Sequence, residues 1–237
     1  MKKSFAHKIT LSLLALTLLS SCSDLFDDKN IQSNPNAVTD VDIPTLLSGT
    51  LVGVTILHED TDVRISAIWA GQLNGLSRQH QGYAEYIVSA QNFSWSPLYP
   101  VASQARLIQT KADAVGDKWT KGVGQVLEAL VIAKATALYG DVPYSQAFDD
   151  VKYPTPVFDK QADVYTALQT TLDNAIQNLS APSGLAFAGQ DFIYGGNVGK
   201  WKAAANTLKA RLYLHMGNYA KAIERPLQWA DELFAYP

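Results

Sequence analysis

Apolar residues recur at intervals of three and four through most of the chain after residue 45, and this spacing constrains the fold more than any other feature. An α-helix turns once every ~3.6 residues, so the spacing places apolar side chains on one face. The interval from Asp159 to Ser180 is the clearest case, and Asp159 is its expected N-cap. Its apolar positions are Tyr165, Leu168, Leu172, Ala175, Ile176 and Leu179. We predict an amphipathic helix here.

Two further intervals predict helices of different character. From Gly124 to Tyr139, apolar residues occupy most of the circumference and leave a narrow polar edge with Glu128 and Lys134. This pattern predicts a helix that is buried on most sides. From Lys200 to Met216 the pattern predicts a third helix, in which Trp201, Ala205, Leu208 and Leu212 share the apolar face and Lys209 lies elsewhere.

Short breaks separate the predicted helices. Gly217 and Asn218 end the third helix, and a new helical pattern starts at Tyr219. Helices joined by so short a turn must lie antiparallel, as in tetratricopeptide-type arrays. Gly140 can adopt a positive φ and Pro143 cannot continue a helix, so we interpret the segment between them as a structural stop.

Strand signals are scarce. Only Ala84–Val88 and Val142–Phe158 have the composition of short extended pieces. We therefore predict a mainly α fold of tetratricopeptide-like helical hairpins with few short strands.

The N-terminus has the order of a secretory signal. Three lysines precede an uncharged apolar run from Ile9 to Leu19, which is shorter than the ~20 residues that span a bilayer. The segment Leu19-Ser20-Ser21-Cys22 resembles the lipobox of bacterial lipoproteins, whose cysteine is acylated and becomes the mature N-terminus. We predict a signal peptide over 1–21, lipidation of Cys22 and a lipidated tether over 22–44. The alternative is a secreted protein with a chance cysteine.

Charge and cysteine content narrow the function classes. Cys22 is the only cysteine, so an intramolecular disulfide is impossible. The signal carries three lysines and no acidic residue, so its removal takes the formal net charge from −3 to −6. An acidic chain without a basic cluster is a poor partner for nucleic acid.

Motifs for catalysis or cofactors are missing. The sequence has no His-Glu-x-x-His and no Gly-x-Ser-x-Gly, and its four histidines are scattered. The glycine-rich stretch 195–200 lacks the first glycine and the Ser/Thr of a phosphate loop, so a turn or helix entry explains it. Glu59, Asp60 and Asp62 could hold calcium or form a solvated loop. We expect no catalytic site, no metal and no cofactor.

The segment from Trp69 to Tyr99 mixes aromatic rings with amide and guanidinium groups. Sugars present apolar CH faces edged by hydroxyls, so this composition suits a sugar site. The candidate ligand-binding residues are Asn74, Arg78, Tyr83 and Trp95. The alternative is that Trp69 and Trp95 are core anchors of helical hairpins while the amides cap loops.

Three segments together resemble the SusD/RagB family of outer-membrane nutrient-binding lipoproteins. These are Gly124–Phe148 with its Tyr-Gly-Asp-Val-Pro, Asp191–Met216, and Asn34-Pro35-Asn36 behind the cysteine. They fit the SusD-like branch described as starch-binding and outer-membrane-associating. Because family members are about twice as long, residues 45–237 are expected to form the N-terminal part of such a helical domain.

The resemblance implies a function without chemistry. Such proteins bind oligosaccharides, or in some members peptides, and sit over a TonB-dependent outer-membrane transporter. Acidic residues behind Cys22 resemble the surface-export signal of the bacteria that make this family, although a solvated spacer explains them as well. A helical protein-interaction scaffold remains the alternative function, and an enzyme comes third.

The lipid anchor gives the first prediction. Acylation requires the thiol, so Cys22→Ala should abolish incorporation of labelled fatty acid and release the protein from the membrane fraction. Metabolic labelling and fractionation measure both effects. Labelling that persists in the variant would contradict the lipoprotein interpretation.

Overall fold

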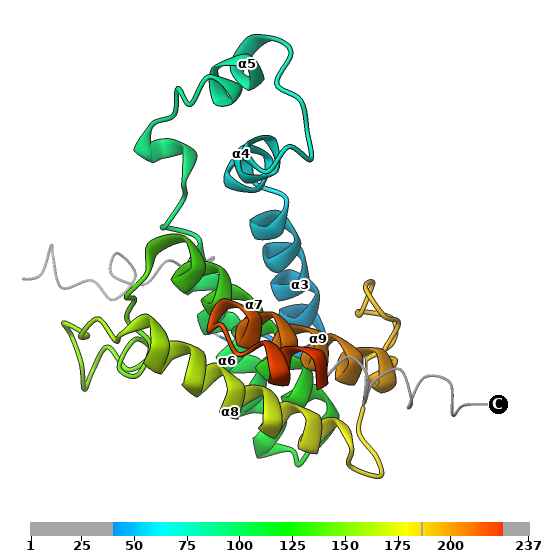
Figure 1. Ribbon diagram of the computed structural model, residues 1–237. Helices are drawn as coiled ribbons and strands as arrows, with labels where there is room; N and C mark the ends of the chain where they lie inside the picture. Colours follow the sequence, from blue (N-terminus) through cyan, green and yellow to red (C-terminus); the bar gives the residue numbers. More distant parts are fainter. Residues whose placement is uncertain (1–39, 186, 225–237) are drawn as a thin grey trace, which may run out of the picture. The chain divides into compact units, whose positions relative to one another are not determined.

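The computed structural model describes residues 40–185 and 187–224, and these are mainly helical (Figure 1). The described residues from Asp42 onward belong to one compact unit. Its elements are α3 (Ile43–His58), α4 (Thr61–Trp69), α5 (Arg78–Ala84), the 3-10 helix η1 (Ala90–Asn92), α6 (Leu98–Ala114), α7 (Lys118–Tyr139), α8 (Gln161–Leu179) and α9 (Val198–His215). Within this part of the chain, β pairing is limited to one isolated bridge between Val142 and Asp159. The predicted mainly α fold is confirmed.

Helix α3 begins at Ile43, two residues before residue 45, where the folded part of the chain was expected to start. The Asp42 carboxylate accepts a hydrogen bond from the Thr45 backbone N–H at 3.1 Å and so caps the helix. Pro44 lies in the first turn, where its fixed φ suits a helix and its missing N–H costs nothing. The predicted signal peptide, Cys22 and most of the predicted tether lie outside the described residues.

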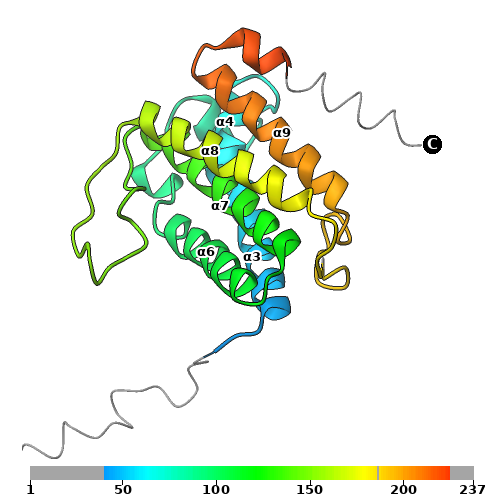
Figure 2. The ribbon, with the colours of Figure 1, turned by 90° about the horizontal axis from the view of Figure 1, so that it is seen from below.

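Helix α7 is the centre of the fold. It packs against α6 on one side and α8 on the other, and also contacts α3 and α9 (Figure 2). Among the described helices it alone is long and apolar enough to cross a membrane, but 72% of that apolar window is buried inside the protein. The prediction of a helix buried on most sides is confirmed, and the apolar character of α7 is explained by its place in the core.

The polar edge predicted for α7 is buried instead. The Glu128 side chain is 3% exposed and accepts hydrogen bonds from Arg106, Gln109 and the Tyr144 hydroxyl. Burial, and then the neighbouring Glu128 carboxylate, raise the pKa of the Tyr144 hydroxyl, which therefore stays a donor at neutral pH. Lys134 forms an ion pair with Asp62 at 2.8 Å. The spacing of residues along the sequence identifies Glu128 and Lys134 as polar positions on an apolar helix. It does not show which side chains of other helices pair with them.

The predicted N-cap of α8 is wrong. The Asp159 carboxylate points back into the preceding loop and accepts hydrogen bonds from the backbone N–H groups of Tyr144 and Ser145 at 2.8 and 2.7 Å. The bridge to Val142 holds the Asp159 backbone in that position. Asp141 does the capping, since its carboxylate accepts from the Gln161 N–H at 3.0 Å.

The end of α7 matches its prediction. Gly140 has a φ of +76°, and its N–H donates to the Thr136 carbonyl at 2.9 Å. A positive φ is strained for residues with a side chain, so glycine suits this position. The stop after Tyr139 is therefore structural, and Asp141 belongs to it as the cap of the next helix.

The end of α9 lies where it was predicted, but the predicted position of Lys209 outside the buried face is wrong. Gly217, with φ of +70°, ends the helix, and residues 219–224 are helical up to the edge of the described part. Lys209 is fully buried, not off the apolar face, and pairs with the half-exposed Asp173 at 2.5 Å. Its long side chain spans apolar surface and reaches a carboxylate on α8. A further helical pattern, over 227–234, predicts another helix that lies outside the described residues.

The glycine-rich stretch before α9 forms a turn around the Asp191 carboxylate. Asp191 accepts hydrogen bonds from the backbone N–H groups of Ile193, Tyr194 and Gly196 at 2.9 to 3.1 Å and from the Trp201 indole N–H at 2.7 Å. Asn197 then caps α9 through the Lys200 N–H. The predicted roles in a turn and a helix entry are confirmed.

Asp191 gives a prediction about stability. Asp191→Ala would leave the Trp201 indole and three backbone N–H groups without their acceptor, so we expect the free energy of unfolding to fall by about 2 kcal/mol or more. Urea denaturation measures it. The control Asp150→Ala, at an exposed loop position, should change stability by less than about 0.5 kcal/mol. Equal losses in the two variants would contradict this account of the loop.

Candidate functional site

The stretch from Ile68 to Tyr86 encloses a small open cleft where α4 meets α5. Its volume is about 430 Å³. The lining consists of Ile68, Trp69, Gly71, Gln72, Leu73, Asn74, Gly75, Ala84 and Tyr86. All of these residues lie within one short stretch of the chain. The loop after α4 reverses the chain direction, so that α5 packs against α4.

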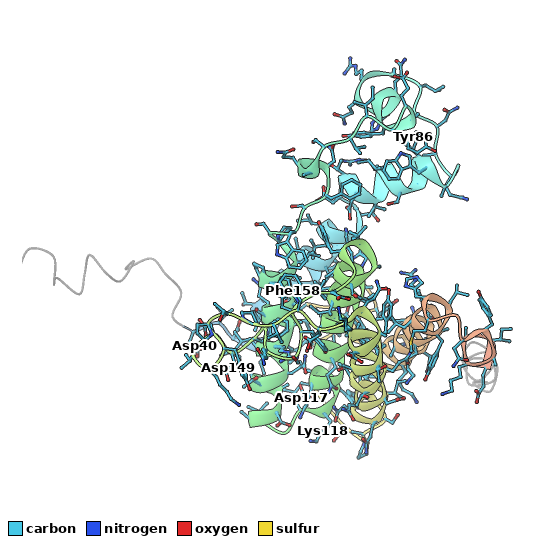
Figure 3. All side chains as sticks on the ribbon, turned by 60° about the vertical axis from the view of Figure 1, so that its left-hand side comes forward. Asp40, Tyr86, Asp117, Lys118, Asp149 and Phe158 are labelled. Atoms are coloured by element: carbon cyan, nitrogen blue, oxygen red, sulfur yellow. The ribbon has the colours of Figure 1, made fainter. Side chains whose placement is uncertain are left out.

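One wall of the cleft is a stack of aromatic rings. The centroids of Trp69 and Tyr86 lie 5.4 Å apart with their planes 29° from parallel, and Phe93 lies 6.3 Å from Trp69. Trp69 is 40% exposed and Tyr86 is 70% exposed. Figure 3 shows Tyr86 beside other rings in this part of the chain. The stack therefore presents a large apolar face to solvent.

Trp69 is held by its indole nitrogen. The Trp69 N–H donates to the Tyr83 carbonyl at 2.8 Å, which joins the end of α4 to the end of α5. The Tyr83 side chain is buried, and its hydroxyl accepts a hydrogen bond from the Asn92 amide at 3.3 Å. A paired N–H fixes the orientation of the ring, so its exposed surface does not have to be ordered when a ligand binds.

The backbone around the cleft is constrained at several points. Tyr86 has a φ of 60° and Arg78 a φ of 54°, a region that costs non-glycine residues roughly 1–2 kcal/mol. Gly75 passes so close to α5 that a Cβ on it would lie 2.0 Å from the His80 carbonyl oxygen. The close approach at Gly75 and the left-handed turn at Tyr86 together direct the Tyr86 ring onto Trp69.

The chemistry of the cleft is neutral. Its polar side chains are the amides of Gln72 and Asn74 and the Tyr86 hydroxyl, and the described lining contains no carboxylate, imidazole, ammonium, guanidinium or thiol. Amides donate and accept hydrogen bonds at once, as hydroxyl groups require of their partners. An aromatic face flanked by amides suits an uncharged ligand with apolar faces and hydroxyl edges.

The four candidate residues do not form one site. Asn74 lines the cleft, whereas Arg78 is exposed at the start of α5 and is absent from the lining. The Tyr83 carbonyl accepts the hydrogen bond from the Trp69 indole N–H, and the Tyr83 ring is buried. Trp95 lies elsewhere.

Trp95 belongs to a second aromatic group, near the start of α6. It packs on Tyr99 and, edge to face, on Tyr139 at centroid distances of 5.1 and 4.9 Å. The Tyr99 hydroxyl donates to the Pro143 carbonyl, and burial, with a further contribution from Asp159, raises its pKa to about 12. Trp95 therefore fits the alternative of a packing anchor between helices, whereas the 40% exposed Trp69 does not.

Sequence reasoning identified the segment but missed its main surface. Trp69, Gln72 and Tyr86 all lie in the stretch singled out for its composition. Tyr83 and Tyr86 could not be told apart by residue type. The backbone turn after Ala84, which exposes one ring and buries the other, has no clear signature in the sequence.

The acidic residues near α4 are used structurally. Asp60 caps the helix through the Thr61 N–H at 2.6 Å, and Asp62 is 4% exposed and pairs with Lys134. A solvated loop was one of the two expectations for this cluster, and it is wrong for the buried Asp62. Across the described residues, no group of three or more His, Cys, Asp or Glu side chains is placed to hold a metal ion.

The family follows from a direct comparison. Residues 35–229 match the model of the SusD-like family described as starch-binding and associating with the outer membrane. The chain belongs to this SusD-like family. No curated protein matches it.

Solved structures share the fold of this SusD-like protein. A SusD/RagB family protein from Bacteroides thetaiotaomicron is 25% identical with a TM-score of 0.68, over 81% of this chain and 43% of that one. A SusD homologue from Parabacteroides distasonis is 20% identical with a TM-score of 0.63, over 83% and 39%. A chitin-binding SusD homologue from Flavobacterium johnsoniae is 20% identical with a TM-score of 0.53, over 77% and 42%. The chain spans less than half the length of these proteins.

Gly75 gives a prediction about the aromatic stack. Gly75→Ala must push α5 away from the loop, so we expect the Trp69–Tyr86 stack to separate and the near-ultraviolet circular dichroism to weaken. Gly49→Ala is the control, because a Cβ there meets nothing within 4 Å. We expect it to leave the spectrum unchanged and stability equal or higher by about 0.5–1 kcal/mol. A Gly75→Ala spectrum identical to that of the parent would show that the close approach does not hold the stack.

Proposed function

We propose that this SusD-like protein is a lipid-anchored nutrient-binding protein of the outer membrane whose cleft between α4 and α5 binds a neutral oligosaccharide without catalysis. One observation carries the proposal. The stacked rings of Trp69 and Tyr86 are exposed to solvent beside the amides of Gln72 and Asn74.

The proposal follows from the chemistry of sugars. The CH face of a pyranose ring would lie on the exposed Tyr86 ring, supported from below by Trp69. Asn74 and Gln72 would orient the hydroxyl groups. Burying a charged sugar or peptide carboxylate here would be costly, because no cation of the described lining faces it.

Names in the family point to the same ligand class. The family is described as starch-binding, and one solved relative is described as chitin-binding. Starch and chitin are both uncharged polysaccharides. A shared preference for neutral glycans agrees with a cleft that lacks charge, while the particular sugar depends on contacts that differ between relatives.

The N-terminal signal and the family are the basis for the proposed location and partners. Lipid on Cys22 would hold the protein at the outer membrane, facing the cell surface, and a TonB-dependent transporter would receive the ligand. A neighbouring gene for such a transporter would support this partnership.

A protein-interaction scaffold is the second candidate. Leu73, Leu76 and Ile87 are 53 to 78% exposed around the cleft, and exposed apolar groups of this kind are typical of protein contacts. Such a surface would bind peptides in preference to sugars, so one binding experiment separates the two functions.

The test is calorimetry of the full-length protein against maltoheptaose, chitohexaose and a neutral peptide. We expect binding of at least one sugar, an affinity about tenfold lower for Tyr86→Ala, and little change for the control Trp95→Ala. Affinity should stay constant between about 0.1 M and about 1 M salt, since a neutral ligand offers no Coulomb energy to screen.

Two outcomes would overturn the assignment. Peptide binding alone would favour the scaffold, or a peptide nutrient. Sugar binding that is lost in Trp95→Ala but kept in Tyr86→Ala would place the site at the other aromatic group.

A further inference from the structure

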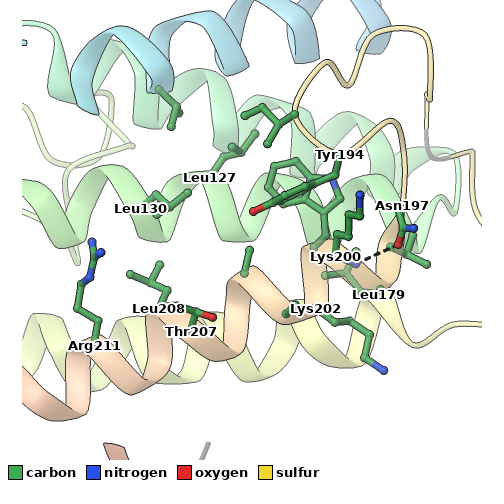
Figure 4. Close-up of a pocket in the computed structure, with 17 residues that line it drawn as sticks. Leu127, Leu130, Leu179, Tyr194, Asn197, Lys200, Lys202, Thr207, Leu208 and Arg211 are labelled. Atoms are coloured by element: carbon green, nitrogen blue, oxygen red, sulfur yellow. Dashed lines mark hydrogen bonds between the residues drawn. The ribbon is translucent and has the colours of Figure 1, made fainter. Parts of the chain in front are cut away.

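A second and larger cavity lies between α3, α7 and α9. Its volume is about 850 Å³, within the range of about 300–1,000 Å³ that is typical of small-molecule sites (Figure 4). Val54 of α3, Leu127 of α7 and Leu208 of α9 form part of its apolar lining. It shares no residue with the cleft described above.

The charges around this groove have one sign. Its lining includes Lys200, Lys202 and Arg211 and no aspartate or glutamate. Such a lining is unusual in a chain with a formal net charge of −3. In Figure 4 the Lys202 side chain points away from the groove, which leaves Lys200 and Arg211 as the relevant cations.

Lys200 and Arg211 differ from those cations that are paired with a carboxylate of the protein. Several cationic side chains of the protein form ion pairs with carboxylates, namely Arg106, Lys118, Lys121, Lys134, Lys160 and Lys209. Within the described residues, neither Lys200 nor Arg211 has a carboxylate partner. An unpaired cation beside an apolar groove favours a ligand that brings its own negative charge.

The helix sets the distance between the two cations. Lys200, Ala204, Thr207 and Arg211 are spaced by four, three and four residues, so they follow one face of α9. Eleven residues of helix span roughly 16 Å. Ala204 and Thr207 are small, so the space between the cations stays open above an apolar floor.

We propose that this groove binds a linear aliphatic carboxylate of the fatty-acid class. The Arg211 guanidinium would pair with the carboxylate, and the alkyl chain would lie along Ala204 and Thr207 towards Lys200, beside the partly exposed Leu130. Burial of its methylene groups away from water would favour binding. This inference is independent of the proposed sugar site.

A docked protein helix fits the groove less well. Helix docking buries large apolar side chains that project from the surface. Few large apolar side chains project from the surface here, since Val54, Leu127 and Trp201 are at most 5% exposed. Ile193, at 41%, is the one large apolar lining residue that is well exposed in the described part.

The test is calorimetric titration of the Cys22→Ala chain, which avoids detergent, with dodecanoate below its micellar concentration. We expect a single site, with binding weakened about tenfold to a hundredfold by Arg211→Gln, because a hydrogen bond to a charged group contributes about 1.5–3 kcal/mol. Lys200→Gln should weaken binding less. Lys152→Gln, which neutralises a loop lysine outside the groove, should leave it unchanged.

Further measurements distinguish specific binding in the groove from non-specific hydrophobic binding to the protein surface. Dodecyltrimethylammonium, with the same chain and the opposite charge, should not bind, and Ala204→Leu should reduce dodecanoate binding by filling the groove. Tyr86→Ala, in the other cleft, should have no effect. Absence of dodecanoate binding, equal binding of the cationic chain, or binding unchanged in the Arg211 and Lys200 variants would overturn the proposal.

Discussion

The burial of α7 is the constraint on which the rest of the structure depends. A helix covered by α6, α8, α3 and α9 loses stability if a charged side chain on it is buried without a partner. Glu128 finds Arg106 and Tyr144, and Lys134 finds Asp62. Since Asp62 lies in the first turn of α4, the pair with Lys134 ties α4 to the core. The aromatic cleft at the other end of α4 therefore rests on a fixed support.

The cleft itself depends on local interactions. The indole N–H of Trp69, the missing side chain of Gly75 and the left-handed turn at Tyr86 hold two rings in contact while leaving them exposed. Exposed rings and a strained turn reduce stability, and features of this kind are common where a protein binds ligands. A rigid aromatic face loses little entropy on binding, which is an advantage for a weakly interacting ligand such as a sugar.

Sequence periodicity predicted the helices because it reports which face of each helix is buried. It placed Glu128, Lys134 and Lys209 poorly, because the partners that allow a charged group to be buried come from other helices. Composition found the aromatic segment, yet Asn74 alone of the four chosen residues lines the cleft. Whether a ring faces solvent there depends on one backbone turn, at Tyr86, that residue types do not reveal.

We place the bound ligand on the Trp69–Tyr86 face. Hydrogen–deuterium exchange of the full-length protein, with and without saturating chitohexaose or maltoheptaose, tests it without any substitution. We expect slower amide exchange confined to residues 69–87, where the loop and α5 would be held against the bound sugar. Slower exchange around Trp95 and Tyr139, with no change over 69–87, would contradict it.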